Sequence, residues 1–152
     1  MTVRTDAIKE FADVGFKWLG NATKGLKQEQ LDWKSSEHAN TIRWILTHLS
    51  EELNVELPKL MGGEVPGEWP ADYTGNTSYK LDKILGDIEA GKKKLYAGLE
   101  KLTDGQLLEE VEAWGMKKPR GWFVDVMVAE LIHHEGQIAA ILGVEKRAKG
   151  IK

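Results

Sequence analysis

Apolar residues recur every three or four positions in the stretch that begins near residue 39, and this spacing strongly constrains the fold. Residues so spaced share one face of an α-helix, so the pattern predicts an amphipathic helix over residues 39–60. Its apolar face comprises Ile42, Ile45, Leu46, Leu49, Leu53 and Leu57. Pro58 makes the last turn irregular, because proline has no amide hydrogen to donate. Gly62-Gly63 ends the helix.

Similar spacing predicts three further helices, so the expected fold class is an all-α four-helix bundle. They cover residues 5–22, 77–102 and 122–142. The third begins at Thr77 or Ser78, because either side chain can accept a hydrogen bond from a free amide of the first turn.

The remaining segments are connectors. A long loop over residues 62–76 lies between the second and third helices and is interpreted as a crossover held by Trp69, although loops of this length are often functional. Residues 106–120 fit either a short helix or a pair of extended segments. Gly143 is a C-cap for the last helix, and residues 146–152 are expected to form a solvated tail.

Length and composition restrict the class of protein. The 152 residues suit one domain, residues 1–152, with one core. The net charge of -3 does not indicate the concentrated positive surface that binds nucleic-acid phosphates. No segment reaches the roughly 20 apolar residues that span a bilayer, and no signal sequence is evident. The chain has no cysteine, which fits a cytoplasmic protein and excludes thiolate chemistry.

The stretch Glu130-Leu131-Ile132-His133-His134-Glu135-Gly136-Gln137 places a carboxylate and two imidazoles inside the last predicted helix. Glu130 and His134 are four residues apart and therefore share a face. A glutamate on a buried face is normally paired or bound to metal. His48 lies on the inner side of the second helix. The pattern predicts a metal site between two helices, with His48, Glu130 and His134 as ligands.

Two imidazoles and one carboxylate suit a divalent ion such as Zn, Ni, Fe or Mn and leave positions open for water or substrate. Glu52 has three interpretations: a fourth ligand, a hydrogen-bond acceptor that orients His48, or an exposed surface residue. The exposed position is favoured. Glu130 and His133 have the spacing of a di-iron carboxylate-histidine pair. The second such pair is absent, so His133 is placed at the helix flank. His38 is interpreted as a surface or capping histidine.

A metal-free interpretation uses the same residues. Glu130 then accepts a hydrogen bond from His134 or His48 in a polar core cluster, and the protein is a non-catalytic binding bundle or a dimeric structural protein. In the metal-binding interpretation the site is an open cleft near the long loop. Trp69 and Trp122 are then candidates to line it.

Two segments resemble the DinB/YfiT-like superfamily, the damage-inducible metalloenzyme family. Thr41-Ile42-Arg43-Trp44-Ile45-Leu46-Thr47-His48-Leu49 is similar to the second-helix segment that ends in a metal-binding histidine. Residues 130–137 are similar to the fourth-helix His-x-x-x-His motif followed by Arg-Gly-Gln. The order of helices and the long middle loop also agree, so the resemblance spans most of the chain.

The resemblance implies a metal held by three histidines, of which His48 and His134 match two. Glu130 stands at the third position, which either gives a two-histidine, one-carboxylate site or marks the loss of the metal. Glu135 replaces the arginine of the motif. Family members with assigned activities are mainly metal-dependent hydrolases or thiol S-transferases acting on small thiols and their conjugates, and homodimers are common. A small-molecule substrate and a homodimer are therefore expected.

Overall fold

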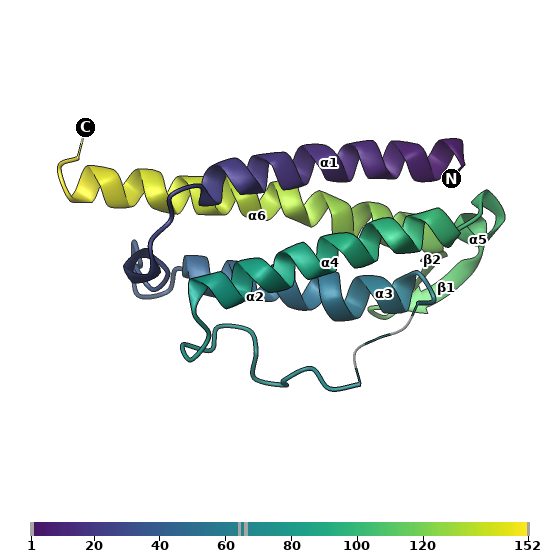
Figure 1. Cartoon of the computed structure of the whole chain (residues 1–152), viewed down its shortest axis with the longest axis horizontal. Helices are drawn as coiled ribbons and strands as arrows, with labels where there is room; N and C mark the ends of the chain where they lie inside the picture. Colours follow the sequence, from purple (N-terminus) through teal and green to yellow (C-terminus); the bar gives the residue numbers. More distant parts are fainter. Residues whose placement is uncertain (1, 64, 66, 152) are drawn as a thin grey trace.

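The computed structural model describes residues 2–63, 65 and 67–151, and its helices confirm the all-α class. The bundle comprises α1 (Val3–Thr23), α4 (Leu81–Lys101), α6 (Arg120–Ala148) and a further helical segment between α1 and α4. Helices α1 and α6 lie side by side along most of their length (Figure 1), and α2 packs on both α4 and α6. This arrangement brings the second and last helices of the bundle face to face.

The second helical segment changes its hydrogen-bonding pattern twice. It runs from α2 (Ile42–Glu51) through the π-helical η2 (Glu52–Glu56) into α3 (Leu57–Leu60). Pro58 has no amide hydrogen for the carbonyl of Asn54, four residues earlier. The Asn54 carbonyl instead accepts a bond of 3.4 Å from Lys94 Nζ. Pro58 lies in the first turn of α3, where a missing amide hydrogen is tolerated, and the helical segment continues through it. Its start lies at Ile42, where the Thr41 hydroxyl caps the Trp44 amide.

One apolar cluster runs between the helices and contains the predicted face of the second segment. Its members from that face are Ile42, Ile45, Leu46, Leu49, Leu53 and Leu57. Gly15 of α1 allows close packing, because a Cβ atom there would lie 2.9 Å from the Cβ of Leu131 in α6. Within the described residues, no helix is both long enough and apolar enough to cross a membrane.

The start of α4 differs from the sequence prediction. The helix begins at Leu81 with Lys80 at its N-cap, and neither Thr77 nor Ser78 caps it. The Leu81 amide instead donates to Gln28 Oε1, 2.8 Å away in the 3₁₀ helix η1 (Gln28–Gln30). A residue more than fifty positions away therefore replaces the local cap.

Helix α6 also departs from the prediction, because it continues through Gly143 to Ala148. Its last turns are held by Glu145, which is buried and accepts bonds from Gln30 Nε2 (2.8 Å) and Lys149 Nζ (2.5 Å). A satisfied buried carboxylate ties the end of the helix to the connector after α1. The first three residues of the predicted tail, 146–148, are therefore helical.

The ambiguous residues 106–120 contain both predicted alternatives. The short helix α5 (Asp104–Leu108) is followed by strands β1 (Glu110–Ala113) and β2 (Met116–Pro119). The strands pair antiparallel, with Glu110 opposite Pro119. Trp114 and Gly115 form the turn, and both have positive φ angles.

The long loop between α3 and α4 is fastened along α2 and α4. Its Gly75 amide donates to Thr47 Oγ1 (2.8 Å), and Thr74 Oγ1 donates to Glu51 Oε2 (2.7 Å). Buried Tyr73 donates to Asp87 of α4. Residues 64 and 66 of this loop lie outside the described part of the chain. The loop therefore packs against the helix that carries His48.

Candidate metal centre

His48 lies in the last turn of α2, one helical turn after Trp44. The two rings stack with centroids 4.9 Å apart and an angle of 24° between their planes. The His48 side chain remains about one third exposed, at 32%. The indole therefore restricts the orientation of a ring that is still accessible from one side.

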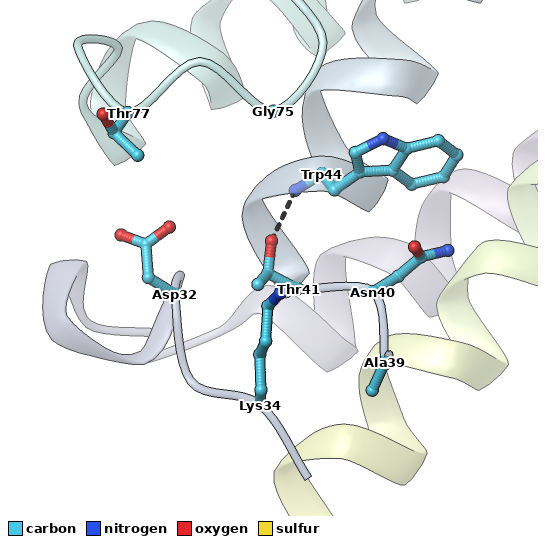
Figure 2. A pocket seen from close by; sticks show the side chains of 8 residues that line it. All are labelled: Asp32, Lys34, Ala39, Asn40, Thr41, Trp44, Gly75 and Thr77. Carbon is cyan, nitrogen blue, oxygen red and sulfur yellow. Dashed lines mark hydrogen bonds between the residues drawn. The ribbon is translucent and has the colours of Figure 1, made fainter. Parts of the chain in front are cut away.

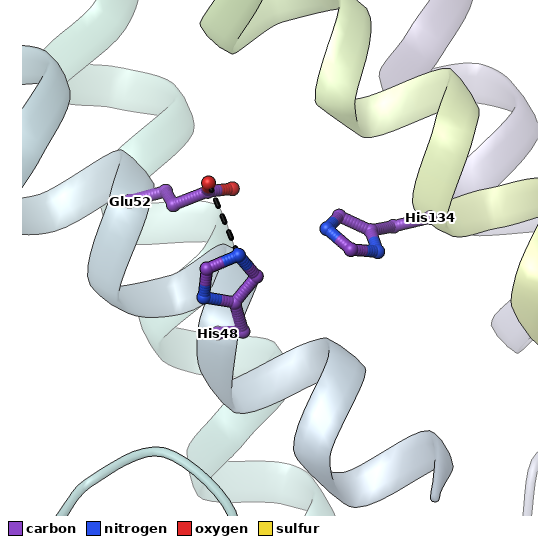
Figure 3. A group of neighbouring side chains, drawn as sticks. All are labelled: His48, Glu52 and His134. Carbon is purple, nitrogen blue, oxygen red and sulfur yellow. Dashed lines mark ion pairs between the residues drawn. The ribbon is translucent and has the colours of Figure 1, made fainter. Parts of the chain in front are cut away.

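His134 of α6 faces His48 from the other side of the bundle, and its side chain is only 6% exposed. The two ring centroids lie 5.2 Å apart with planes at 86° (Figure 3). The structure thus brings together two of the three predicted ligands. They come from α2 and α6 because each occupies the inward face of its helix.

Glu52 lies at the start of η2 and points toward both histidines (Figure 3). Its Oε1 is 3.2 Å from His48 Nε2, and its side chain is 14% exposed. The favoured sequence interpretation, an exposed Glu52, is therefore wrong. The neighbouring Glu51 instead bonds the long loop through Thr74. Hydrogen bonding to Glu52 raises the pKa of His48 above its ordinary value of 6.5, despite partial desolvation of the ring.

Glu130 approaches His134 from one turn earlier in α6. Its Oε2 lies 3.3 Å from His134 Nε2, and its side chain is 32% exposed. Among the described residues, two groups have potential ligand atoms within 4.8 Å of one another: His48, Glu52 and His134, and Glu130, His133 and His134. His134 belongs to both. The predicted set of His48, Glu130 and His134 is thus linked through His134, and it does not itself form one of these groups.

His133 is exposed, as expected for a residue at the helix flank, yet it is not isolated. Its Nε2 lies 3.1 Å from Gln137 Nε2, and Gln137 Oε1 lies 2.9 Å from His134 Nδ1. Gln137 was not assigned a role from the sequence. Gln137 follows His133 by four residues and His134 by three. This helical spacing places all three on neighbouring positions of one helix surface, and it is the sequence signal that could have identified Gln137.

Two buried side-chain atoms of this cluster, Glu52 Oε2 and His134 Nε2, have no hydrogen-bond partner among the residues that the structure describes. Unpaired buried polar atoms are costly, so they usually mark an ion, a water or a functional role. Nitrogen and oxygen ligands about 2.0–2.1 Å from a tetrahedral ion lie roughly 3.3 Å from each other. The 3.2 Å and 3.3 Å separations from Glu52 to His48 and from Glu130 to His134 have this size. The donor set therefore fits a divalent metal.

A cavity of about 350 Å³ lies at the start of α2 (Figure 2). Its wall includes Trp44, whose ring stacks on His48. The other lining residues are Asp32, Lys34, Ala39, Asn40, Thr41, Gly75 and Thr77. Hydroxyl, amide and charged groups thus line the cavity. Trp44 also lines it and stacks on His48, one of the candidate ligands.

Trp69 and Trp122, the candidates to line the cleft, are not among the described residues that line this cavity. Trp69 packs on Tyr73 within the long loop, with ring centroids 4.7 Å apart. Trp122 contacts Phe123 near the start of α6. It precedes His134 by twelve residues, which is about 18 Å along a helix. Trp44 stacks on His48 of the cluster, a role that was not predicted from the sequence.

The sequence of this chain matches the DinB superfamily over residues 19–138, a range that contains every residue of the cluster. The chain belongs to the DinB superfamily. The resemblance found from the two short motifs is thereby confirmed.

A solved structure supports the DinB-superfamily fold. The crystal structure of the conserved protein of locus from Enterococcus faecalis is similar to this chain with a TM-score of 0.76. The similarity covers 95% of this chain and 97% of that one, at 12% sequence identity. At this identity the likeness concerns the fold alone. No curated protein matches the chain.

Proposed function

We propose that this DinB-superfamily protein binds a divalent metal ion and acts as a metal-dependent hydrolase or thiol S-transferase on a small molecule. His48, Glu130 and His134 are the proposed ligands, as the sequence predicts. Glu52 supplies a further carboxylate, because its side chain is only 14% exposed and its Oε1 lies 3.2 Å from His48 Nε2. Zn, Ni, Fe and Mn all suit this mixture of imidazole and carboxylate ligands.

The observation that carries the proposal is the unpaired Nε2 atom of His134. This atom is buried and has no hydrogen-bond partner in the described part of the chain, and His134 belongs to the same group of candidate ligands as His48 and Glu52. A metal-free polar cluster would be expected to satisfy that nitrogen, because burying it without a partner is costly.

The chain's own residues prepare the site for chemistry. Trp44 stacks on one face of His48 and limits its rotation, and Glu52 bonds its Nε2 edge. The cavity beside Trp44 offers room for a small substrate, with exposed Lys34 available for an anionic group. The bound ion supplies Lewis-acid activation of water or of a substrate thiol.

Elemental analysis of untagged protein purified without chelator tests the proposal, together with His48→Ala and His134→Ala. Near-stoichiometric metal in the parent protein, lost in both variants, is the expected result and would justify hydrolase and thiol-transfer assays. No bound metal in the parent, and no uptake of added Zn, Ni, Fe or Mn, would instead favour the alternative of a non-catalytic bundle with a polar core cluster.

We also propose that the protein is a homodimer paired through the exposed face of α1. Phe11, Val14 and Trp18 are 44%, 39% and 45% exposed and lie on one side of this helix. Exposed Glu10 and Lys17 share one flank of that side. An antiparallel, two-fold pairing of α1 helices would place each Glu10 near the partner's Lys17. A second copy of the chain is therefore complementary in both polarity and charge.

Charge reversal at this flank tests the dimer by light scattering coupled to gel filtration. Lys17→Glu alone should weaken association through like charges, and adding Glu10→Lys should restore it. A parent protein that is monomeric at all accessible concentrations would contradict the proposal.

A further inference from the structure

Gln137 lies between two histidine rings on the same surface of α6. Its Oε1 is 2.9 Å from His134 Nδ1, and its Nε2 is 3.1 Å from His133 Nε2. His133 is exposed, whereas the His134 side chain is 6% exposed. One amide group thus joins an accessible imidazole to the buried imidazole of the candidate metal centre.

The two ends of an amide have fixed and opposite hydrogen-bonding roles. The amide nitrogen of Gln137 can only donate, so the Nε2 atom of His133 accepts. The amide oxygen can only accept, so the Nδ1 atom of His134 donates. A neutral imidazole carries one proton, and a proton on Nδ1 leaves Nε2 with a free electron pair. The hydrogen bonds therefore select one tautomer of His134.

Glu130 opposes this selection. Its Oε2 lies 3.3 Å from His134 Nε2, and a carboxylate at that distance favours a proton on the nitrogen it faces. No hydrogen bond forms between them, and none of the other described residues provides a partner for His134 Nε2. The hydrogen bond between His134 Nδ1 and Gln137 Oε1 is formed, whereas His134 Nε2 and Glu130 Oε2 are not hydrogen-bonded. The hydrogen bond to Gln137 therefore has the stronger effect on which ring nitrogen of His134 carries the proton.

We propose that Gln137 is a positioning residue that holds His134 as the Nδ1–H tautomer and keeps its Nε2 electron pair directed toward Glu52 and His48. The tautomer is a property of the metal-free protein. Its consequence, a preformed nitrogen ligand, rests on the proposed function. Outer hydrogen bonds of this kind fix ring orientation and typically change metal affinity by 10- to 100-fold.

Two variants separate the acceptor role of Gln137 from its bulk. Gln137→Leu keeps a similar volume and removes the acceptor. Gln137→Glu keeps an oxygen acceptor for His134 Nδ1 and is the conservative rescue. Both are examined without metal at alkaline pH, where the imidazoles are neutral. Long-range ¹H–¹⁵N NMR correlations then distinguish the protonated ring nitrogen of His134 from the unprotonated one.

The expected spectra show the proton on Nδ1 in the parent and in Gln137→Glu, and on Nε2 in Gln137→Leu. A proton on Nε2 in the parent protein would overturn the proposal, even if Gln137→Leu fails to fold. An unchanged tautomer in a folded Gln137→Leu would overturn it as well. A thermal unfolding transition shows whether each variant is folded, and therefore whether its spectrum can be compared with that of the parent.

Titration with ZnCl₂ measures the consequence separately. Gln137→Leu should bind Zn²⁺ about 10- to 100-fold more weakly than the parent, with Gln137→Glu close to the parent. Equal Zn²⁺ affinity in parent and Gln137→Leu would contradict the positioning role. A parent that binds no Zn²⁺, yet shows the Nδ1 proton, would refute the zinc-binding function and support the tautomer assignment.

Discussion

His48 and His134 stand edge to face with ring centroids 5.2 Å apart, although one belongs to α2 and the other to α6. An ion shared by these rings would cross-link two helices that are distant in sequence. Such an ion binds the folded chain and not the unfolded one, so its affinity adds directly to stability. Thermal unfolding is therefore a sensitive measure of this site.

Metal should stabilise the parent protein and not the histidine variants. At a free Zn²⁺ concentration 100-fold above Kd, the expected gain is about 2.7 kcal/mol, or a rise in Tm of roughly 5–11 °C for a chain of this size. His48→Ala and His134→Ala should lose this rise, which differential scanning fluorimetry would measure. His38→Ala is the matched control because His38 is exposed and outside both ligand groups. An equal shift in all four proteins would indicate binding elsewhere.

Replacing Glu52 should lower the pKa of His48 in the metal-free protein, since bonding to Glu52 is the largest influence that raises it. Stability from this pair is full below the ordinary pKa of 6.5 and fades as pH rises through the raised folded pKa. Glu52→Gln should therefore flatten the pH dependence of unfolding above that value. NMR titration of His48 checks the pKa, with Glu51→Gln as the control of smaller effect. An unchanged pKa in Glu52→Gln would refute the pairing.

Asp32 should stabilise the protein by pairing with the buried guanidinium of Arg43. Asp32 accepts from Arg43 Nε (2.6 Å) and Nη2 (2.8 Å), while Arg43 also donates to the Tyr79 carbonyl. Asp32→Ala leaves that buried charge with one protein partner fewer. Because Asp32 is half exposed and solvent screens the pair, the expected loss is only about 1–2 kcal/mol.

The same pair predicts a pH dependence of defined sign. Hydrogen bonding to Arg43 lowers the pKa of Asp32 below its ordinary value of 3.8. Its contribution is complete above that value and is lost as pH falls through the depressed folded pKa. Urea unfolding of parent and Asp32→Ala should therefore differ at neutral pH and converge in strong acid. A constant difference at every pH would contradict an ionic contribution.

Two glycines of α4 should respond oppositely to alanine. A Cβ atom at Gly91 would overlap the side chain of Leu53, where α4 crosses η2, so Gly91→Ala should cost about 1–3 kcal/mol. Gly86 has nothing within 4 Å of that position, so Gly86→Ala should stabilise the helix by about 0.5–1 kcal/mol. Chemical denaturation of both variants measures the difference. Destabilisation of similar size at both sites would mean that packing against Leu53 is not the cause.

Helix positions were predictable because they depend on the spacing of apolar residues along a short stretch of chain. Helix ends were less predictable where the residue that caps them comes from a distant part of the sequence. Thr41 caps α2 locally, three residues before Trp44, whereas Leu81 depends on Gln28 and the last turns of α6 depend on Gln30 through Glu145. No local pattern reports a partner dozens of residues away.

The candidate site divides in the same way. The sequence by itself determined the helical fold and that Glu130 and His134 share a face, because helical spacing decides which side chains point together. Only the tertiary structure brought His48 within ring contact of His134, turned Glu52 inward and set Gln137 against His134 Nδ1. The physical reason is that helix periodicity is local, whereas the distance and rotation between two helices depend on packing across the whole core.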